Sequence, residues 1–197
     1  MNIEKLIQGN KDFIRKFSKE KELYLKLATK GQSPKVLWIG CSDSRVVPEF
    51  IVNAKAGELF VVRNIANIVP PQSANDRNMS TILEYAILHL KVEHIVICGH
   101  TCCGGITSLV KETSSDSNIS AWLRYARPAL SSKKDTSESI KETIENNILL
   151  QVENLLSYDL IRKNQKNIKI HKWLYDIHTG ALLHHDDNIN CWKFDAE

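Results

Sequence analysis

The 197-residue sequence lacks any long apolar run, and this absence excludes whole classes of protein. No hydrophobic stretch approaches the length of a secretion-signal core or of a membrane-spanning helix. Charge of one sign is not in excess either, because 26 Lys and Arg residues face 23 Asp and Glu residues. Nothing in this balance indicates a nucleic-acid partner or an anionic membrane surface. We therefore expect a cytoplasmic protein that binds neither nucleic acid nor membrane.

The sequence also lacks a disulfide pattern. Its cysteines are odd in number, follow no regular spacing and form no C-x-x-C redox motif. A chain of this length can bury a core without cross-links or a structural metal. The cysteines are therefore candidates for metal binding or catalysis, and they are Cys41, Cys98, Cys102, Cys103 and Cys191.

The length is typical of one compact domain, and no internal repeat or low-complexity tract divides the chain. We interpret residues 1–197 as a single domain that opens with a helical arm over residues 1–30. Within this arm, apolar residues from Ile3 to Phe17 recur at helical spacing, with Lys and Glu on the opposite side. Such an amphipathic helix needs an apolar surface to pack against.

Three short apolar runs predict buried strands, and they cover residues 35–41, 58–63 and 94–98. Between the second and third runs, apolar residues from Met79 to Leu90 keep helical spacing. Strands that alternate with helices and are apolar on both faces are typical of an α/β fold with a mainly parallel sheet flanked by helices. Ligands collect at the carboxyl ends of such strands, where Cys41 and His100 both fall.

The C-terminal half predicts further helices and then strands. One helix is expected within residues 114–143, and a second is expected to begin near Ser137; we interpret both as a layer that covers the same domain. The alternating run from Ile168 to His178 predicts a strand at the edge of the sheet. Thr179-Gly180 then predicts a turn into a hairpin-like ending.

Side chains capable of metal chemistry follow two of the predicted strands. Cys41 begins the run Cys-Ser-Asp-Ser-Arg, and His100 begins His-Thr-Cys-Cys about sixty residues later. Two thiolates and an imidazole suit zinc, and three protein ligands leave a fourth position open for water. Zinc lowers the pKa of that water and so supplies hydroxide. Asp43 and Arg45 are close enough to form a bidentate pair that keeps Asp43 ionised and directed at the water.

Each of these residues also has a plainer interpretation. A lone buried cysteine is usually a small hydrophobic residue, and a nearby Asp and Arg usually cap a turn or form a surface pair. The joint pattern favours a metal site, because two strand ends finish in metal-capable groups. Gly99, Gly104 and Gly105 flank the second group and open a helix. Of the two adjacent cysteines, helical periodicity favours Cys103 over Cys102 as the ligand.

The remaining histidines show no ligand partner at a telling spacing, and we expect them to lie at surface or core positions. They are His89, His94, His171, His178, His184 and His185.

Taken together, these elements resemble a beta-class carbonic anhydrase. The C-x-D-S-R and H-x-x-C motifs stand in that family's order, and the likeness continues through residues 58–67, 84–86 and 173–177. The resemblance implies one zinc ion per chain, with Cys41, His100 and Cys103 as ligands and Asp43 and Arg45 as a catalytic dyad. The implied activity is the reversible hydration of carbon dioxide to bicarbonate and a proton, through zinc-bound hydroxide that the dyad orients.

The resemblance also implies how the substrate binds. Gln32 is expected to donate an amide hydrogen bond, beside a narrow apolar pocket that suits a linear neutral molecule. The residues assigned to substrate binding are Gln32, Phe60, Ile65, Tyr85 and Gly104.

A regulatory site and an assembly follow from the same likeness. Trp38, Arg63 and Tyr175 match positions that form a bicarbonate site in another branch of the family, where Asp43 swings onto zinc in an inactive form. Core packing of Trp38 and Tyr175 is the alternative. Because family members are built from dimers whose N-terminal helices reach across the partner, we expect a homodimer or a homotetramer.

Three alternatives stay open at this point. The same zinc hydroxide can hydrolyse carbon disulfide or carbonyl sulfide, and access to the pocket would decide between the substrates. A non-catalytic zinc-binding or bicarbonate-binding protein is a second alternative, which the presence of both Asp43 and Arg45 disfavours. A thiol redox protein that uses the vicinal Cys102 and Cys103 is the third.

Overall fold

The computed structural model describes residues 2–113, 117–131 and 136–194, and the chain divides between Ser33 and Pro34 into two compact units. The first unit holds the helices α1 (Ile3–Phe17) and α2 (Lys21–Lys30). Helix α1 has the bounds predicted from its apolar spacing. It begins where Asn2 Oδ1 accepts a hydrogen bond from the backbone N–H of Lys5 at 3.0 Å, which caps the first turn.

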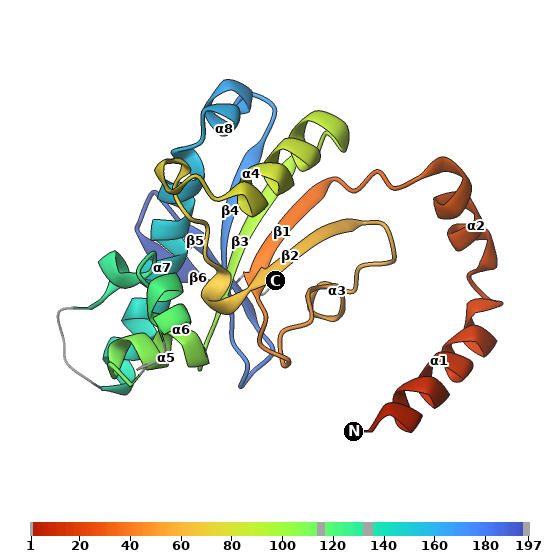
Figure 1. Cartoon of the computed structure of the whole chain (residues 1–197), viewed down its shortest axis with the longest axis horizontal. Helices are drawn as coiled ribbons and strands as arrows, with labels where there is room; N and C mark the ends of the chain where they lie inside the picture. The colour runs from red at the N-terminus through yellow and green to blue at the C-terminus, as the bar shows by residue number, and fades with distance from the viewer. Residues whose placement is uncertain (1, 114–116, 132–135, 195–197) are drawn as a thin grey trace. The chain divides into compact units, whose positions relative to one another are not determined.

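The second unit is built on a six-stranded sheet (Figure 1). Its order is β2-β1-β3-β4-β5-β6, and the first three pairings are parallel while the last two are antiparallel. The strands are β1 (Val36–Cys41), β2 (Leu59–Asn64), β3 (His94–His100), β4 (Lys169–Tyr175), β5 (Leu182–Asp186) and β6 (Cys191–Lys193). The predicted α/β fold with a mainly parallel sheet is confirmed.

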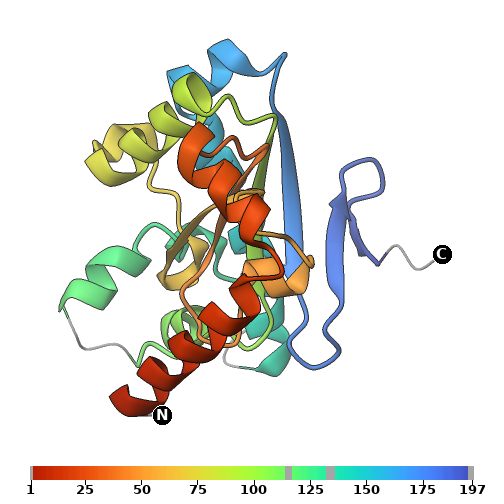
Figure 2. The ribbon, with the colours of Figure 1, turned by 90° about the vertical axis from the view of Figure 1, so that its right-hand side faces the viewer.

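Helices α4 to α8 lie on one side of this sheet, and the short α3 lies on the other (Figures 1 and 2). The longest, α7, runs along β3 and β4 and begins at a capping box in which Thr136 and Ser139 bond reciprocally. The helices are α3 (Pro48–Ile51), α4 (Arg77–Glu84), α5 (Gly104–Val110), α6 (Ser117–Leu123), α7 (Ser137–Leu156) and α8 (Asp159–Asn164).

Apolar side chains fill both faces of the inner strands. Leu37, Ile39, Ile95 and Ile97 belong to the large core that includes residues of α4, α5 and α7. Trp38 begins a smaller cluster, with Val96 and Cys98, and alternation along a strand explains this division between the faces. Within the described residues, no helix is long and apolar enough to cross a membrane.

One sequence prediction is wrong. The strand expected at the sheet edge, β4, lies inside the sheet between β3 and β5. The reason is that the hairpin-like ending adds two antiparallel strands, β5 and β6, which continue the sheet beyond it. The helix predicted over residues 79–90 is also interrupted, because α4 ends at Glu84 and a π-helical turn spans Tyr85–His89.

The covering helices predicted within residues 114–143 are present as α6 and the start of α7. Parts of that segment, residues 114–116 and 132–135, lie outside the described residues.

Candidate metal centre

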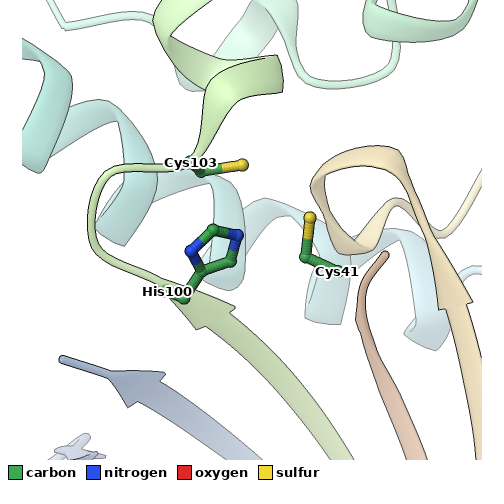
Figure 3. Close-up of side chains that lie close together, drawn as sticks. All are labelled: Cys41, His100 and Cys103. Carbon is green, nitrogen blue, oxygen red and sulfur yellow. The ribbon is translucent and has the colours of Figure 1, made fainter. Parts of the chain in front are cut away.

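The predicted metal ligands come together at the carboxyl ends of two adjacent parallel strands. Cys41 ends β1, His100 ends β3, and Cys103 is the residue before α5. Between the last two ligands the chain turns sharply, because Cys102 takes a φ of 57°, in the left-handed region. Figure 3 shows the two sulfur atoms and the imidazole ring directed into a common space.

The three side chains form a buried set of ligand atoms. One atom from each lies within 4.8 Å of the others, and no other such group of three is found among the described residues. The imidazole is fixed by a hydrogen bond that His100 Nδ1 donates to the carbonyl of Thr101 at 2.8 Å. In the described part of the chain, Nε2 of this ring is buried without a hydrogen-bond partner.

This arrangement is that of a metal-binding histidine, whose second ring nitrogen is bonded to a backbone carbonyl. An unpartnered buried nitrogen costs free energy, and an ion at this place removes the cost. The residues present therefore fit a zinc ion with one imidazole and two sulfur ligands.

In the absence of an ion, one of the two thiols is ionised and the other stays protonated. A hydrogen bond from Cys103 lowers the pKa of Cys41 to about 4, and the nearby imidazole of His100 and the backbone of Asp43 and Ala66 act in the same direction. The pKa of Cys103 is raised, because it donates that hydrogen bond and lies beside the Cys41 charge in a buried place. The pocket thus places negative charge where a cation would bind.

Asp43 and Arg45 form the predicted two-pronged pair. Arg45 donates from Nε to Asp43 Oδ1 at 2.9 Å and from Nη2 to Oδ2 at 2.7 Å. These hydrogen bonds hold the pKa of Asp43 well below its usual range, so the carboxylate is ionised. Asp43 Oδ2 lies 3.9 Å from His100 Nε2, which puts the carboxylate beside the metal ligands.

Sequence reasoning named Arg63 only for a bicarbonate site and did not predict the contacts that hold the surrounding loops. Arg63 donates from Nε to the carbonyl of Cys41 at 2.8 Å and from Nη2 to the carbonyl of Asp43 at 2.6 Å. On the other side, Asn147 donates to the carbonyl of Ala66 at 3.0 Å, and Ala66 takes a φ of 64°. In the sequence, the only indication of the bonds on this second side is that two polar residues, Asn147 and Gln151, interrupt the apolar spacing of α7.

The residues assigned to substrate binding are placed differently from one another. Phe60 and Tyr85 have ring centroids 5.8 Å apart, and Tyr85 begins the π-helical turn, a feature often found at functional sites. Ile65 and Tyr85 are 47% and 42% exposed, so the single chain does not enclose them. Gly104 is the first residue of α5, and Gln32 belongs to the first unit, where it is exposed.

Of the residues assigned to bicarbonate regulation, Trp38 and Tyr175 pack in the same apolar cluster, on the face of the sheet away from α7. Trp38 is fully buried, and within the described residues its Nε1 has no hydrogen-bond partner. The guanidinium of Arg63 bonds the carbonyls described above and lies on an exposed part of β2.

The other thiols and imidazoles lie apart from the ligand set. Cys98 is buried and Cys102 is exposed, and all five cysteines are free thiols. Whereas Cys103 contacts Cys41, Cys102 lies near His178. His94 and His171 contact one another at 3.0 Å on neighbouring strands.

Comparisons with known proteins agree with this geometry. A family model described as carbonic anhydrase matches residues 36–182. A carbonic anhydrase of Synechococcus elongatus is 34% identical over 193 residues, which cover 92% of this chain and 71% of that protein.

Two solved structures extend the comparison. The beta-carbonic anhydrase CcaA superposes with a TM-score of 0.92 at 31% identity, over 99% of this chain and 92% of that one. A beta-carbonic anhydrase from Sordaria macrospora gives a TM-score of 0.82 at 31% identity, over 95% and 96% of the two chains. The shared fold, the family match and the Cys-His-Cys site together show that the chain belongs to the beta-class carbonic anhydrase family of enzymes.

Proposed function

We propose that this enzyme hydrates carbon dioxide reversibly to bicarbonate and a proton, with one zinc ion per chain held by Cys41, His100 and Cys103. The observation that carries the proposal is the buried Nε2 of His100, which has no partner among the described residues and is directed toward two thiols. Bound zinc supplies a nucleophile at neutral pH, because it lowers the pKa of water.

Asp43 acts as the hydrogen-bond acceptor that orients the nucleophilic water. Its ionised carboxylate can only accept, and Arg45 occupies both of its oxygens from one side. The backbone N–H of Arg45 adds a third hydrogen bond, to Oδ1 at 3.0 Å. These bonds oppose movement of Asp43 toward the metal, so the open arrangement is the resting form.

Carbon dioxide binds against the apolar side chains near the site. Phe60, Ile65 and the ring of Tyr85 offer apolar surface, which suits a neutral linear molecule. Gln32 donates an amide hydrogen bond to the reacting oxygen atom. Gly104 leaves space at the start of α5, where an added Cβ atom would meet nothing within 4 Å. Because Ile65 and Tyr85 are exposed in one chain, a second subunit completes the pocket.

The working form is a homodimer or a homotetramer. The solved beta-carbonic anhydrases of Sordaria macrospora are described as tetrameric. In α1, large apolar side chains are about half exposed or more, and they are Ile3, Leu6, Ile7, Phe13 and Ile14. A stripe of this kind favours burial against a second copy of the chain, as expected for the arm predicted over residues 1–30.

Bicarbonate also binds near Trp38 as a regulator. Support comes from the buried indole Nε1, which lacks a partner in the described part of the chain and can donate to an oxygen anion. Trp38→Phe keeps an aromatic ring, although a smaller one, and removes this donor. Weaker inhibition by bicarbonate in the variant supports the site, and unchanged inhibition assigns Trp38 to core packing alone.

The first test is stopped-flow hydration of carbon dioxide, with zinc measured on the same sample. About one zinc per chain together with rapid hydration at neutral pH supports the proposal. Hydration confined to alkaline pH would instead indicate a closed form in which Asp43 is a zinc ligand. Zinc without hydration at any pH would overturn the assignment, and parallel assays with carbonyl sulfide and carbon disulfide would then test the sulfur substrates.

A further inference from the structure

A second chemical cluster lies on the outer side of the loop between His100 and Cys103. Its members are Cys102, His178 and Asp176, and Cys102 and His178 are 76 positions apart in the sequence. Cys102 Sγ lies 3.8 Å from His178 Nε2. The other ring nitrogen of His178, Nδ1, lies 3.2 Å from Asp176 Oδ1.

The order of these contacts sets the role of each group. Asp176 is held at the end of β4 by hydrogen bonds from Thr101 Oγ1 at 3.1 Å and from Thr179 Oγ1 at 2.7 Å. The hydrogen bond from Thr179, followed by the backbone bond from His178, lowers the pKa of Asp176 to about 2. The ionised carboxylate accepts from Nδ1–H, so Nε2 of His178 presents its lone pair to the Cys102 sulfur. Cys102, His178 and Asp176 are thus arranged in space as a nucleophile, a base and the group that orients the base.

A cavity of about 520 Å³ opens beside this cluster. Cys102, Asp176 and His178 lie in its wall, and Ile140, Ile144 and Leu174 contribute apolar surface to the same wall. Such a cavity holds a small apolar chain next to the sulfur. The thiol is exposed, whereas the ligand thiols Cys41 and Cys103 are buried.

We propose that Cys102 is an acyl acceptor for thioesters or activated esters that carry a short apolar chain, with His178 as the base. The Sγ–H proton moves to His178 Nε2 while the sulfur attacks the carbonyl carbon of the ester. A sulfur–carbon bond forms, the bond from that carbon to the leaving oxygen or sulfur breaks, and the leaving group takes the proton from His178. The product is a thioester on Cys102, and the reaction involves no oxidant, no reductant and no metal.

The test uses the zinc-loaded enzyme and p-nitrophenyl hexanoate, with the acylated residue identified by peptide mass spectrometry. Covalent acylation separates this chemistry from ester hydrolysis at the metal, which leaves no acyl group on the chain. Cys191 is the internal control, because its thiol is also not buried. We expect Cys102 to be acylated at least about tenfold faster than Cys191.

His178→Gln is the matched variant. It should lower the rate of acylation at Cys102 by about 10²-fold, as loss of a positioned base does, and should leave the rate at Cys191 unchanged. Zinc content and carbon dioxide hydration of this variant should equal those of the parent, which would show that the fold and the metal site are intact. Equal rates at Cys102 in the two proteins, or no preference for Cys102 over Cys191, would overturn the proposal.

Two further variants distinguish the role of the cavity from the role of Asp176 as the positioning residue. In the parent, we expect Cys102 to react faster with the hexanoate ester than with the acetate ester, because the cavity holds the longer apolar chain. Ile140→Ser should remove this preference without slowing acetylation. Asp176→Asn should slow acylation by both esters about tenfold while it keeps that preference, with recovery in Asp176→Glu. A loss of chain preference in Asp176→Asn would indicate a structural role, and an unchanged preference in Ile140→Ser would exclude the cavity as the acyl site.

Discussion

Asp43 and Arg45, two residues apart, are joined by three hydrogen bonds, two from the guanidinium and one from the backbone N–H of Arg45. Arg45 Nη2 also donates to the carbonyl of Cys102 at 3.1 Å, which ties the loop after β1 to the loop after β3. A single guanidinium therefore links the carboxylate to the segment between two of the proposed metal ligands. A planar group with several donors is needed for both contacts.

Asp43→Asn should lower the rate of carbon dioxide hydration by about 10²-fold, because an amide is not a charged acceptor. Zinc content should stay at the parent level, since the ligands are unchanged. Stopped-flow rates at several pH values with metal analysis would measure both quantities. Arg45→Lys should be about tenfold slower than the parent, because Lys cannot form the bidentate pair. Full activity in Asp43→Asn would exclude the carboxylate from the reaction.

Cys103→Ser should reduce zinc affinity by at least about 10²-fold, because a thiolate ligand is replaced by a weakly coordinating hydroxyl. Cys98→Ala is the matched control, since Cys98 is a buried thiol on β3 outside the ligand set. Competition with a chromogenic chelator would give both affinities. Equal losses in the two variants would point to a general effect of disturbing the core.

Gln151→Leu should lower the free energy of unfolding by about 1–3 kcal/mol, because it leaves buried polar groups without partners. The amide of Gln151 accepts from the backbone N–H of Val69 at 2.8 Å and donates to Asn147 Oδ1 at 2.8 Å. Urea unfolding monitored by circular dichroism would measure the difference. Glu153→Gln, at an exposed position of the same helix, should change stability by less than about 0.5 kcal/mol.

The folded protein should lose stability as the pH falls through the range where His171 gains a proton in the unfolded chain. Burial, followed by the nearby charge of His94, lowers the pKa of His171 below 6.5 in the folded state. Between the two pKa values the unfolded chain binds more protons, so the free energy of unfolding rises with pH. His171→Gln should therefore lose less stability than the parent between about pH 7.5 and about pH 5. Unfolding curves at both pH values would test this.

The control for that measurement is His89→Gln, because His89 is exposed. This variant should follow the parent across the same range. An identical pH dependence in His171→Gln and the parent would contradict the assignment to His171.

Much of the metal site could be predicted from local sequence. Cys41 and His100 each end a short apolar strand, Cys103 follows His100 by three residues, and parallel strands bring their carboxyl ends to one edge. Asp43 and Arg45 are close enough in the chain that their pairing needs no tertiary information. Periodicity likewise predicted α1 with its bounds, because the apolar spacing and the cap at Asn2 are both local.

The tertiary structure alone decided the contacts between residues far apart in the chain. The interior place of β4 depends on its pairing with β5. The role of Arg63 depends on which carbonyls lie within its reach. Cys102 approaches His178 because the ends of β3 and β4 are neighbours. Periodicity reports which face of an element is buried, but hydrogen-bond partners depend on the register between elements. The sequence thus determined which residues can bind a metal and on which strand ends they lie, whereas packing determined which other groups surround them.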